Sequence, residues 1–250
     1  MGIFNFEEER INYLTQLTIG GKGIPGLHDF GYESSEVFFD GVLAYTRRNS
    51  LYALGKNGEI IWKSEFTDGS KDGIGGQSLS NFKSLLFYPS GTKDIESDIQ
   101  LLGIDIKTGS KRVLVKEPAI DSKNNMTSRM GAPVGYLFQN DTIVTFQVRK
   151  YGSLDGYRTD LVAWNITKNK QLWRVDSLDR KGNGSFNTPI YENEKIYYAG
   201  INNIYWLDAF TGELIWRQGF DNFNYQIIHH SLLSLDYGLI VKSHDNERHF

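Results

Sequence analysis

The hydrophobic pattern is clearest in residues 204–217, IYWLDAFTGELIWR, where two short apolar runs flank a polar turn. Ile204–Leu207 combines aliphatic and aromatic residues, which is typical of a half-buried strand. In the segment Asp208–Gly212, the aspartate side chain can accept hydrogen bonds from the following main chain, and the glycine tolerates a positive φ. Leu214–Trp216 begins a second apolar run. The stretch therefore predicts a β-hairpin with a fixed-length turn.

The same hairpin pattern occurs five times along the chain, with a large apolar residue at one fixed position. Its other copies are Ile3–Tyr13, Ala53–Trp62, Gly103–Val113 and Ala163–Trp173. We call the residue at the fixed position of each hairpin the marker residue; the markers are Tyr13, Trp62, Val113, Trp173 and Trp216. Repetition on this scale is typical of propellers and solenoids, and the fixed marker indicates a repeated packing role.

The order of strands and hairpins becomes regular only when the chain is treated as a circle. After Trp216 two further strands are expected, over 232–235 and 239–242, but no hairpin follows them, while the N-terminal hairpin has no strands before it. Closure of a radial fold by both termini protects sheet edges. We therefore predict an all-β, single-domain, five-bladed β-propeller with four-stranded blades, in which the N-terminal hairpin supplies the outer strands of the last blade. The expected blades are residues 36–66, 81–116, 133–176, 186–220, and 229–250 together with 3–18.

The repeat has a family resemblance. The aspartate, Thr-Gly and tryptophan pattern of Tyr205–Trp216, with Asp105, Thr108 and Gly109 in a second copy, resembles the repeat of the PQQ-like (quinoprotein alcohol dehydrogenase-like) β-propellers. The resemblance implies the fold more than an activity. Propellers of this family more often have seven or eight blades, and their enzymes use a calcium-held quinone, in many members beside a vicinal cysteine pair. None of those cofactor residues can be matched to a position of this chain, so no cofactor is expected.

Composition and charge exclude several function classes. The formal net charge is −3 and the pI is near 6.0, which gives no electrostatic footprint for nucleic acid. There are no cysteines, so disulfides and cysteine nucleophiles are excluded. The first residues have no basic region followed by an apolar one, and no apolar run is long enough for a membrane span. We expect a cytoplasmic monomer that binds neither membrane nor nucleic acid.

The most distinctive candidate binding residues lie in a segment expected to be an exposed insertion, residues 149–160, between the second and third strands of the third blade. Arginine and tyrosine, which are common at binding hot spots, recur in this segment. Other candidates follow from the loops and blade entries that gather on one face of a propeller. The predicted binding residues are Arg149, Tyr151, Asp155, Tyr157, Arg158, Arg47, His28, Arg129 and His229. An ordinary solvated loop is the alternative interpretation of this segment.

No catalytic motif stands out. The five histidines show no ligand spacing, so no metal site is expected. We therefore expect a non-enzymatic module or inhibitor, comparable to an adaptor or an immunity protein, that binds a protein partner through one face of the propeller. The alternative is a carbohydrate-active hydrolase or lyase, or a sugar-binding propeller, with its site at the channel mouth. A glycosidase needs two carboxylates about 5–10 Å apart, and the candidates Asp29, Glu33, Asp72 and Asp155 form no pattern.

Overall fold

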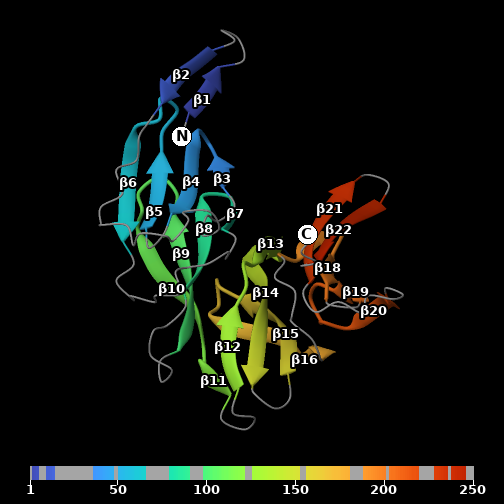
Figure 1. Ribbon diagram of the computed structural model, residues 1–250. Coiled ribbons are helices and arrows are strands. Elements are labelled where there is room, and N and C mark those ends of the chain that lie inside the picture. Colours follow the sequence, from blue (N-terminus) through green and yellow to red (C-terminus); the bar gives the residue numbers. More distant parts are fainter. Residues whose placement is uncertain are drawn as a thin grey trace.

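The computed structural model describes residues 2–5, 10–14, 36–47, 50–65, 79–90, 98–121, 126–152, 156–180, 188–200, 203–219, 228–235 and 238–245. Within these residues the protein is built of antiparallel strands alone, without a helix. Figure 1 shows the sheets following one another along an arc, with the N-terminal hairpin at one end and the C-terminal hairpin at the other. The predicted all-β class is confirmed.

Four sheets in the arc contain the four-stranded antiparallel unit of a propeller blade, and we number these blades in chain order. Blade 1 consists of β3 (Val37–Phe39), β4 (Val42–Arg47), β5 (Ser50–Leu54) and β6 (Ile60–Glu65). Blade 2 consists of β7 (Ser80–Phe82), β8 (Leu85–Ser90), β9 (Ile99–Asp105) and β10 (Lys111–Glu117). Blade 3 consists of β13 (Val134–Phe138), β14 (Asp141–Gly152), β15 (Gly156–Asn165) and β16 (Lys170–Arg180), with β11 (Ile120–Asp121) and β12 (Met126–Met130) added beside β14. Blade 4 consists of β17 (Ile190–Glu192), β18 (Lys195–Ala199), β19 (Asn203–Asp208) and β20 (Leu214–Gly219).

The turn of the repeated hairpin is held by its aspartate. One carboxylate oxygen of Asp208 accepts hydrogen bonds from the main-chain N–H of Phe210 at 2.9 Å, the N–H of Thr211 at 2.8 Å and the Thr211 hydroxyl at 3.0 Å. Gly212 then adopts a φ of 74°. Asp105 makes the same contacts with residues 107 and 108 of blade 2. Two copies of the sequence pattern therefore fold into the same turn.

A tryptophan of one blade docks on the turn of the next. The indole N–H of Trp62 donates to the carbonyl oxygen of Ile106 at 2.8 Å, and that of Trp173 donates to the carbonyl oxygen of Ala209 at 3.0 Å. A Cβ at Gly212 would lie only 2.7 Å from the Trp173 ring, so the glycine also makes room for the indole. The predicted packing role of the marker is thus confirmed at both of these junctions.

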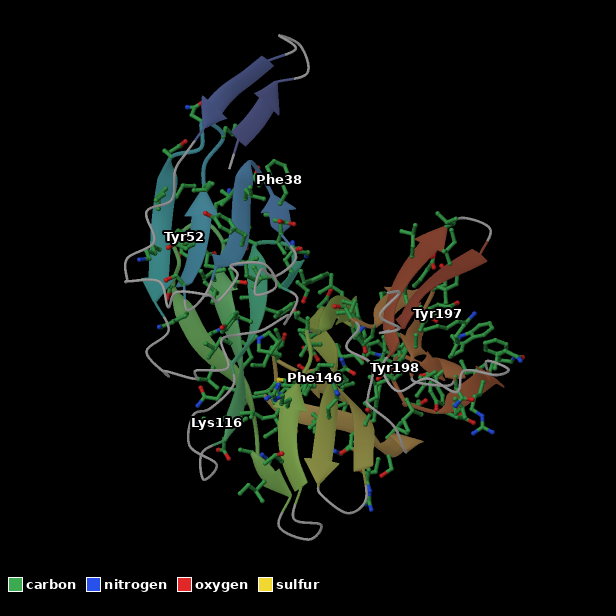
Figure 2. The ribbon with its side chains drawn as sticks, in the orientation of Figure 1. Phe38, Tyr52, Lys116, Phe146, Tyr197 and Tyr198 are labelled. Carbon is green, nitrogen blue, oxygen red and sulfur yellow. The ribbon has the colours of Figure 1, made fainter. Side chains whose placement is uncertain are left out.

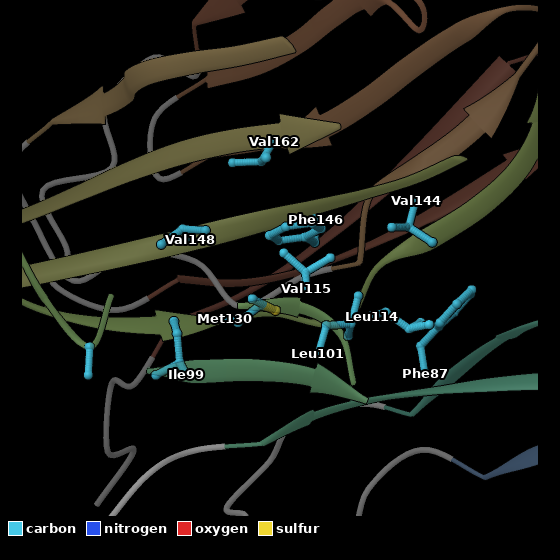
Figure 3. Close-up of a cluster of buried hydrophobic side chains, with 11 residues drawn as sticks. Phe87, Ile99, Leu101, Leu114, Val115, Met130, Val144, Phe146, Val148 and Val162 are labelled. Carbon is cyan, nitrogen blue, oxygen red and sulfur yellow. The ribbon is translucent and has the colours of Figure 1, made fainter. Parts of the chain in front are cut away.

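The hydrophobic core is divided among the blade junctions. One buried cluster joins blades 1 and 2, a second joins blades 2 and 3, and a third joins blades 3 and 4. Figure 3 shows the second cluster, in which Phe87 and Leu101 of blade 2 face Val144 and Phe146 of β14. Each blade is therefore stabilised mainly by its neighbours, as in other repeat folds.

The two terminal hairpins form separate two-stranded sheets. β1 (Gly2–Asn5) pairs with β2 (Arg10–Leu14), and β21 (Ile228–Leu235) pairs with β22 (Gly238–Asp245). In the described residues neither pair is hydrogen-bonded to the other. The predicted count of five blades and the predicted closure by both termini are consequently not confirmed by the sheet pairing.

Candidate functional site

Blade 3 is extended beyond the plan of the other blades. Its strands β14, β15 and β16 contain 12, 10 and 11 residues, whereas the strands of blades 1, 2 and 4 contain three to seven. The segment 149–160, expected to be an insertion loop, is therefore mostly strand, because β14 continues to Gly152 and β15 resumes at Gly156. We call the outer part of this sheet, residues 126–130, 148–152 and 156–160, the blade 3 extension.

The strand register brings five predicted binding residues together in this extension. Arg129 on β12 lies opposite Arg149 on β14. On the neighbouring pair of strands, Tyr151 lies opposite Tyr157, and Lys150 lies opposite Arg158. Directly opposed residues share a face of the sheet. The register therefore places arginine on both faces of the extension and brings its arginine and tyrosine positions next to one another.

Arg149 departs from the expectation of an exposed cluster. Its side chain is only 5% exposed, whereas Arg129 is exposed and Arg158 is half-buried. The reason is the alternation of the strand, since Arg149 shares a face with the buried residues Thr145 and Gln147. That face is directed at blade 4, from which the Tyr198 hydroxyl donates to the Gln147 side-chain oxygen at 2.9 Å.

An ion network anchors the base of the extension. The guanidinium of Arg174 on β16 makes three hydrogen bonds of 3.1 Å to the Glu117 carboxylate, which belongs to blade 2. It also bonds Asp160 at 3.2 Å, and the ammonium of Lys150 lies 2.8 Å from the same Asp160 oxygen. The Asp160 side chain is only 2% exposed and that of Glu117 is 8% exposed. The network joins blades 2 and 3 and links β14, β15 and β16 at the base of the extension.

The contacts of these carboxylates fit an anchoring role better than an acid–base role. Both oxygens of Glu117 are bonded to Arg174, and the second oxygen of Asp160 accepts the main-chain N–H of Ser177 at 2.9 Å. Burial lowers the pKa of Arg174, but its bonds and proximity to Glu117 and Asp160 outweigh this effect, and the net shift of its pKa is upward. The cation therefore remains charged.

Sequence reasoning missed Glu117, Asp160 and Arg174 as a group. They are separated by 43 and 14 positions along the chain, and no spacing rule connects them. Only Asp160 could have been suspected from the sequence, because it directly precedes the apolar run that starts at Leu161. A charged residue buried beside such a run needs a partner of opposite charge.

The remaining predicted residues lie elsewhere. Arg47 ends β4, and His229 on β21 lies opposite His244 on β22. His28 and Asp155 fall outside the described residues, as do the carboxylate candidates Asp29, Glu33 and Asp72. Within the described part of the chain, no three side chains of the types His, Cys, Asp and Glu come together as a metal site would need.

The repeated hairpins match the sequence pattern of a known protein family. A family model described as outer membrane protein assembly factor BamB matches residues 158–247, which include the hairpins of Trp173 and Trp216. Over these residues the chain carries PQQ-like β-propeller repeats. The resemblance predicted from the turn aspartate, the Thr-Gly pair and the marker tryptophan is thus confirmed.

Solved structures agree on the fold. A europium-containing methanol dehydrogenase is 16% identical with a TM-score of 0.56, over 82% of this chain and 45% of its own. A quinohemoprotein alcohol dehydrogenase from Comamonas testosteroni is 14% identical with a TM-score of 0.53, over 85% of this chain and 39% of its own. A structure described as KlHsv2 with loop 6CD replaced by a Gly-Ser linker is 11% identical with a TM-score of 0.57, over 97% of this chain and 68% of its own. At these identities the likeness shows the fold alone.

The chain spans less than half the length of the dehydrogenases that it resembles. No curated protein matches it in sequence. The quinone of the enzymes that the repeat resembles is held by calcium, which prefers several carboxylate and carbonyl oxygens, and no group of His, Cys, Asp or Glu side chains that could hold a metal ion occurs among the described residues. The described residues therefore do not fit that cofactor. In the described part of the chain there is no helix long and apolar enough to cross a membrane.

Proposed function

We propose that this protein is a non-enzymatic binding module that engages a protein partner through the blade 3 extension. The observation that carries the proposal is the extra length of β14, β15 and β16, because the compact blade 4 shows that shorter strands suffice for a blade. The added length of β14 and β15 carries Arg149, Tyr151, Tyr157 and Arg158. These residue types contribute strongly at protein interfaces.

Rigidity supports the same proposal. The extension is built on paired strands, and the Arg174 network ties it to blade 2. A surface that is ordered before binding loses less conformational freedom when a partner arrives. The partner that fits is a protein surface with acidic residues, because Arg129 and Arg158 supply positive charge. The same surface should also have apolar sites against which tyrosine rings can pack.

The test is a pull-down from cells of the source organism, followed by titration of the recovered partner. The site variant combines Arg129→Ala, Tyr151→Ala, Tyr157→Ala and Arg158→Ala; it leaves Arg149 intact, because that residue is buried. The control variant combines Arg112→Ala and Lys116→Ala, two exposed basic residues on β10. We expect the site variant to weaken binding at least about 100-fold and the control to bind normally. A stoichiometric partner that binds both variants equally would contradict the proposed site, and recovery of a glycan ligand instead would favour the carbohydrate alternative.

We also propose that the ring has five blades and that the termini share the last one. The hairpin β1–β2 carries a β-bulge between Ile3 and Phe4. The outer hairpins of blades 1, 3 and 4 carry a bulge at the equivalent place, after Ala53, Ala163 and Trp206. Each of these residues pairs with a marker residue, as Ile3 pairs with Tyr13. The geometry of the N-terminal hairpin thus supports its assignment as the outer half of a blade.

A further inference from the structure

The pairing of β15 with β16 is interrupted where blade 3 ends and the blade 3 extension begins. At this point one residue of β15, Asp160, lies opposite three residues of β16, residues 176–178. The other irregularities in the described strand pairs insert a single residue. We call Asp160 and residues 176–178 the elbow of blade 3. The strand pairs on its two sides are Leu161 with Val175, and Thr159 with Asp179.

The elbow contains a residue with a strained backbone. Ser177 has a φ of 51°, which residues other than glycine rarely adopt. In the described chain seven other non-glycine residues have a positive φ, but each of them lies in a turn between two strands, whereas Ser177 lies inside β16. Such strain persists only where surrounding contacts hold it, and it is often found at functional sites. The contacts of Ser177 therefore need an explanation.

Asp160 makes the contact that holds this conformation. One oxygen of its buried carboxylate accepts the main-chain N–H of Ser177 at 2.9 Å. The other oxygen lies 3.2 Å from Nε of Arg174 and 2.8 Å from Nζ of Lys150. Burial shields these contacts from water, and electrostatic interactions are stronger in such an environment. A single carboxylate on β15 thus links the elbow residue of β16 to β14.

The neighbouring blades hold the elbow from both sides. On the side of blade 4, the Tyr205 hydroxyl donates to the main-chain carbonyl of Leu178 at 2.9 Å. The Leu178 side chain also packs on the buried cluster between blades 3 and 4. On the side of blade 2, Glu117 binds Arg174, which bonds Asp160 in turn. The bend is therefore fixed by the ring as well as by the extension.

The elbow lies directly beside Arg158, a residue of the proposed binding surface. Arg158 is two positions from Asp160 on β15, so the two side chains share a face of the sheet. Lys150 lies directly opposite Arg158. Like charges at such positions repel each other, and the Asp160 carboxylate compensates the charge of Lys150. Since a bulge also bends its strand and increases the local twist, Asp160 influences both the charge around Arg158 and its direction.

We infer that Asp160 is a positioning residue for the partner-binding surface: it holds Ser177 in the bent conformation, and the bend sets the position from which Arg158 meets the partner. Asp160 acts through Arg158 and needs no contact with the partner itself. A bend that is formed before association limits the conformational freedom lost on binding. The inference rests on the binding function proposed above.

A matched pair of substitutions at Ser177 tests the bend without changing a charge. Ser177→Gly adopts a positive φ freely, whereas Ser177→Val resists it because its side chain is β-branched. In hydrogen exchange we expect Ser177→Val to accelerate the amides of residues 156–159 at least about tenfold and to leave those of residues 161–165 unchanged. Ser177→Gly should change neither segment. Equal acceleration of both segments by Ser177→Val, or none, would overturn the elbow as a local element.

Titration of the partner recovered by the pull-down tests the role of Asp160. We expect Asp160→Ala to weaken binding by the folded protein at least about tenfold, and added Ser177→Gly to restore at least about threefold, because glycine holds the bend with less support. A variant Asp160→Ala that is less stable but binds normally would show a purely structural role and overturn the inference. If Asp160→Ala does not fold, the Ser177 pair decides: Ser177→Val must weaken binding and Ser177→Gly must not.

A double-mutant cycle with Arg158 separates this inference from the proposed function. The combined effect of Asp160→Ala and Arg158→Ala on binding should be smaller than the sum of the single effects, because both act through the same guanidinium. Full additivity would overturn the positioning role and leave the proposed function standing. Failure to recover a partner, or a partner that binds the four-residue site variant normally, would reject the proposed function and the positioning role together, while the exchange data would still decide whether the bend exists.

Discussion

Trp173 and Trp216 occupy the same position of the same repeat but meet different surroundings. Trp173 is 7% exposed and donates its indole N–H to Ala209 of the next blade, whereas Trp216 is 44% exposed. The local hairpins are alike, with the bulge at the same place. The difference shows that the repeat sequence sets where the tryptophan lies in its hairpin, whereas packing of the following blade determines whether the indole is buried.

The largest expected effect is on Trp173. Trp173→Ala should lower the free energy of unfolding by about 3–5 kcal/mol, because a large buried side chain is replaced by a cavity. Trp173→Phe retains much of the packing but leaves the Ala209 carbonyl with one donor fewer, and should cost about 1–2 kcal/mol. Chemical denaturation measures both. Trp216→Ala should cost less than Trp173→Ala, and equal losses would break the comparison.

The next effect concerns the anchored junction between blades 2 and 3. Arg174→Ala should destabilise the protein by about 3 kcal/mol, because it leaves the buried carboxylates of Glu117 and Asp160 with less compensating charge. Arg217→Ala, at an exposed position beside Trp216, is the matched control and should change stability by less than about 0.5 kcal/mol. Thermal and denaturant unfolding would show the contrast, and an effect of Arg174→Ala as small as that of the control would mean that the network contributes little.

A smaller effect is expected where the indole meets the turn. Gly212→Ala should cost about 1–3 kcal/mol, because φ is 74° and the added Cβ would lie 2.7 Å from the Trp173 ring. Gly238→Ala is a suitable control, since nothing lies within 4 Å of a Cβ built there. Combining Gly212→Ala with Trp173→Ala should relieve part of the loss. Simple additivity in such a double-mutant cycle would argue against the contact.

The smallest effect is the acid sensitivity of the turn. Burial raises the pKa of the Asp208 carboxyl. Hydrogen bonds from the N–H groups of Phe210 and Thr211 and from the Thr211 hydroxyl lower this pKa more, so it lies below its usual value of 3.8. A carboxyl with a lowered folded-state pKa stabilises the fold above its unfolded pKa, and this contribution is lost as the pH falls through the folded value. Asp208→Asn should therefore cost about 1 kcal/mol at pH 7, and the difference from the natural protein should shrink below about pH 4. A constant difference from pH 7 to pH 3 would contradict this assignment.

The local fold could be predicted from the sequence, because its signals are local. The turn chemistry of Asp208 to Gly212 and the fixed marker residue lie within eleven residues, and the structure shows the hairpin that they predict. Asp40-Gly41 likewise forms a turn with positive φ at both residues. These signals depend on backbone preferences that the rest of the molecule does not alter.

The candidate site was harder to predict. Residue type alone draws attention to the tyrosines and arginines of residues 149–158, but a strand twice the usual length has no short-range signal, so the sequence predicts a loop where the structure has strands. Burial of Arg149 follows from strand alternation, which a loop assignment could not include. The Glu117–Arg174 pair joins two blades and depends on tertiary packing alone.

The most direct test of the proposed five-bladed ring is a cross-link between the C-terminal hairpin and blade 1, which would be neighbours in a closed ring. Tyr191 of β17 stacks on Tyr136 of the preceding blade with centroids 4.1 Å apart. Its counterpart in blade 1 is Phe38, which Figure 2 labels and which is 71% exposed by its accessible surface. The counterpart of Tyr136 on β21 is Leu233. In the variant Phe38→Cys with Leu233→Cys, a five-bladed ring closed within one chain predicts a disulfide that forms inside the monomer. A monomer that remains reduced under oxidising conditions, or a disulfide found only between two chains, would contradict the closed ring.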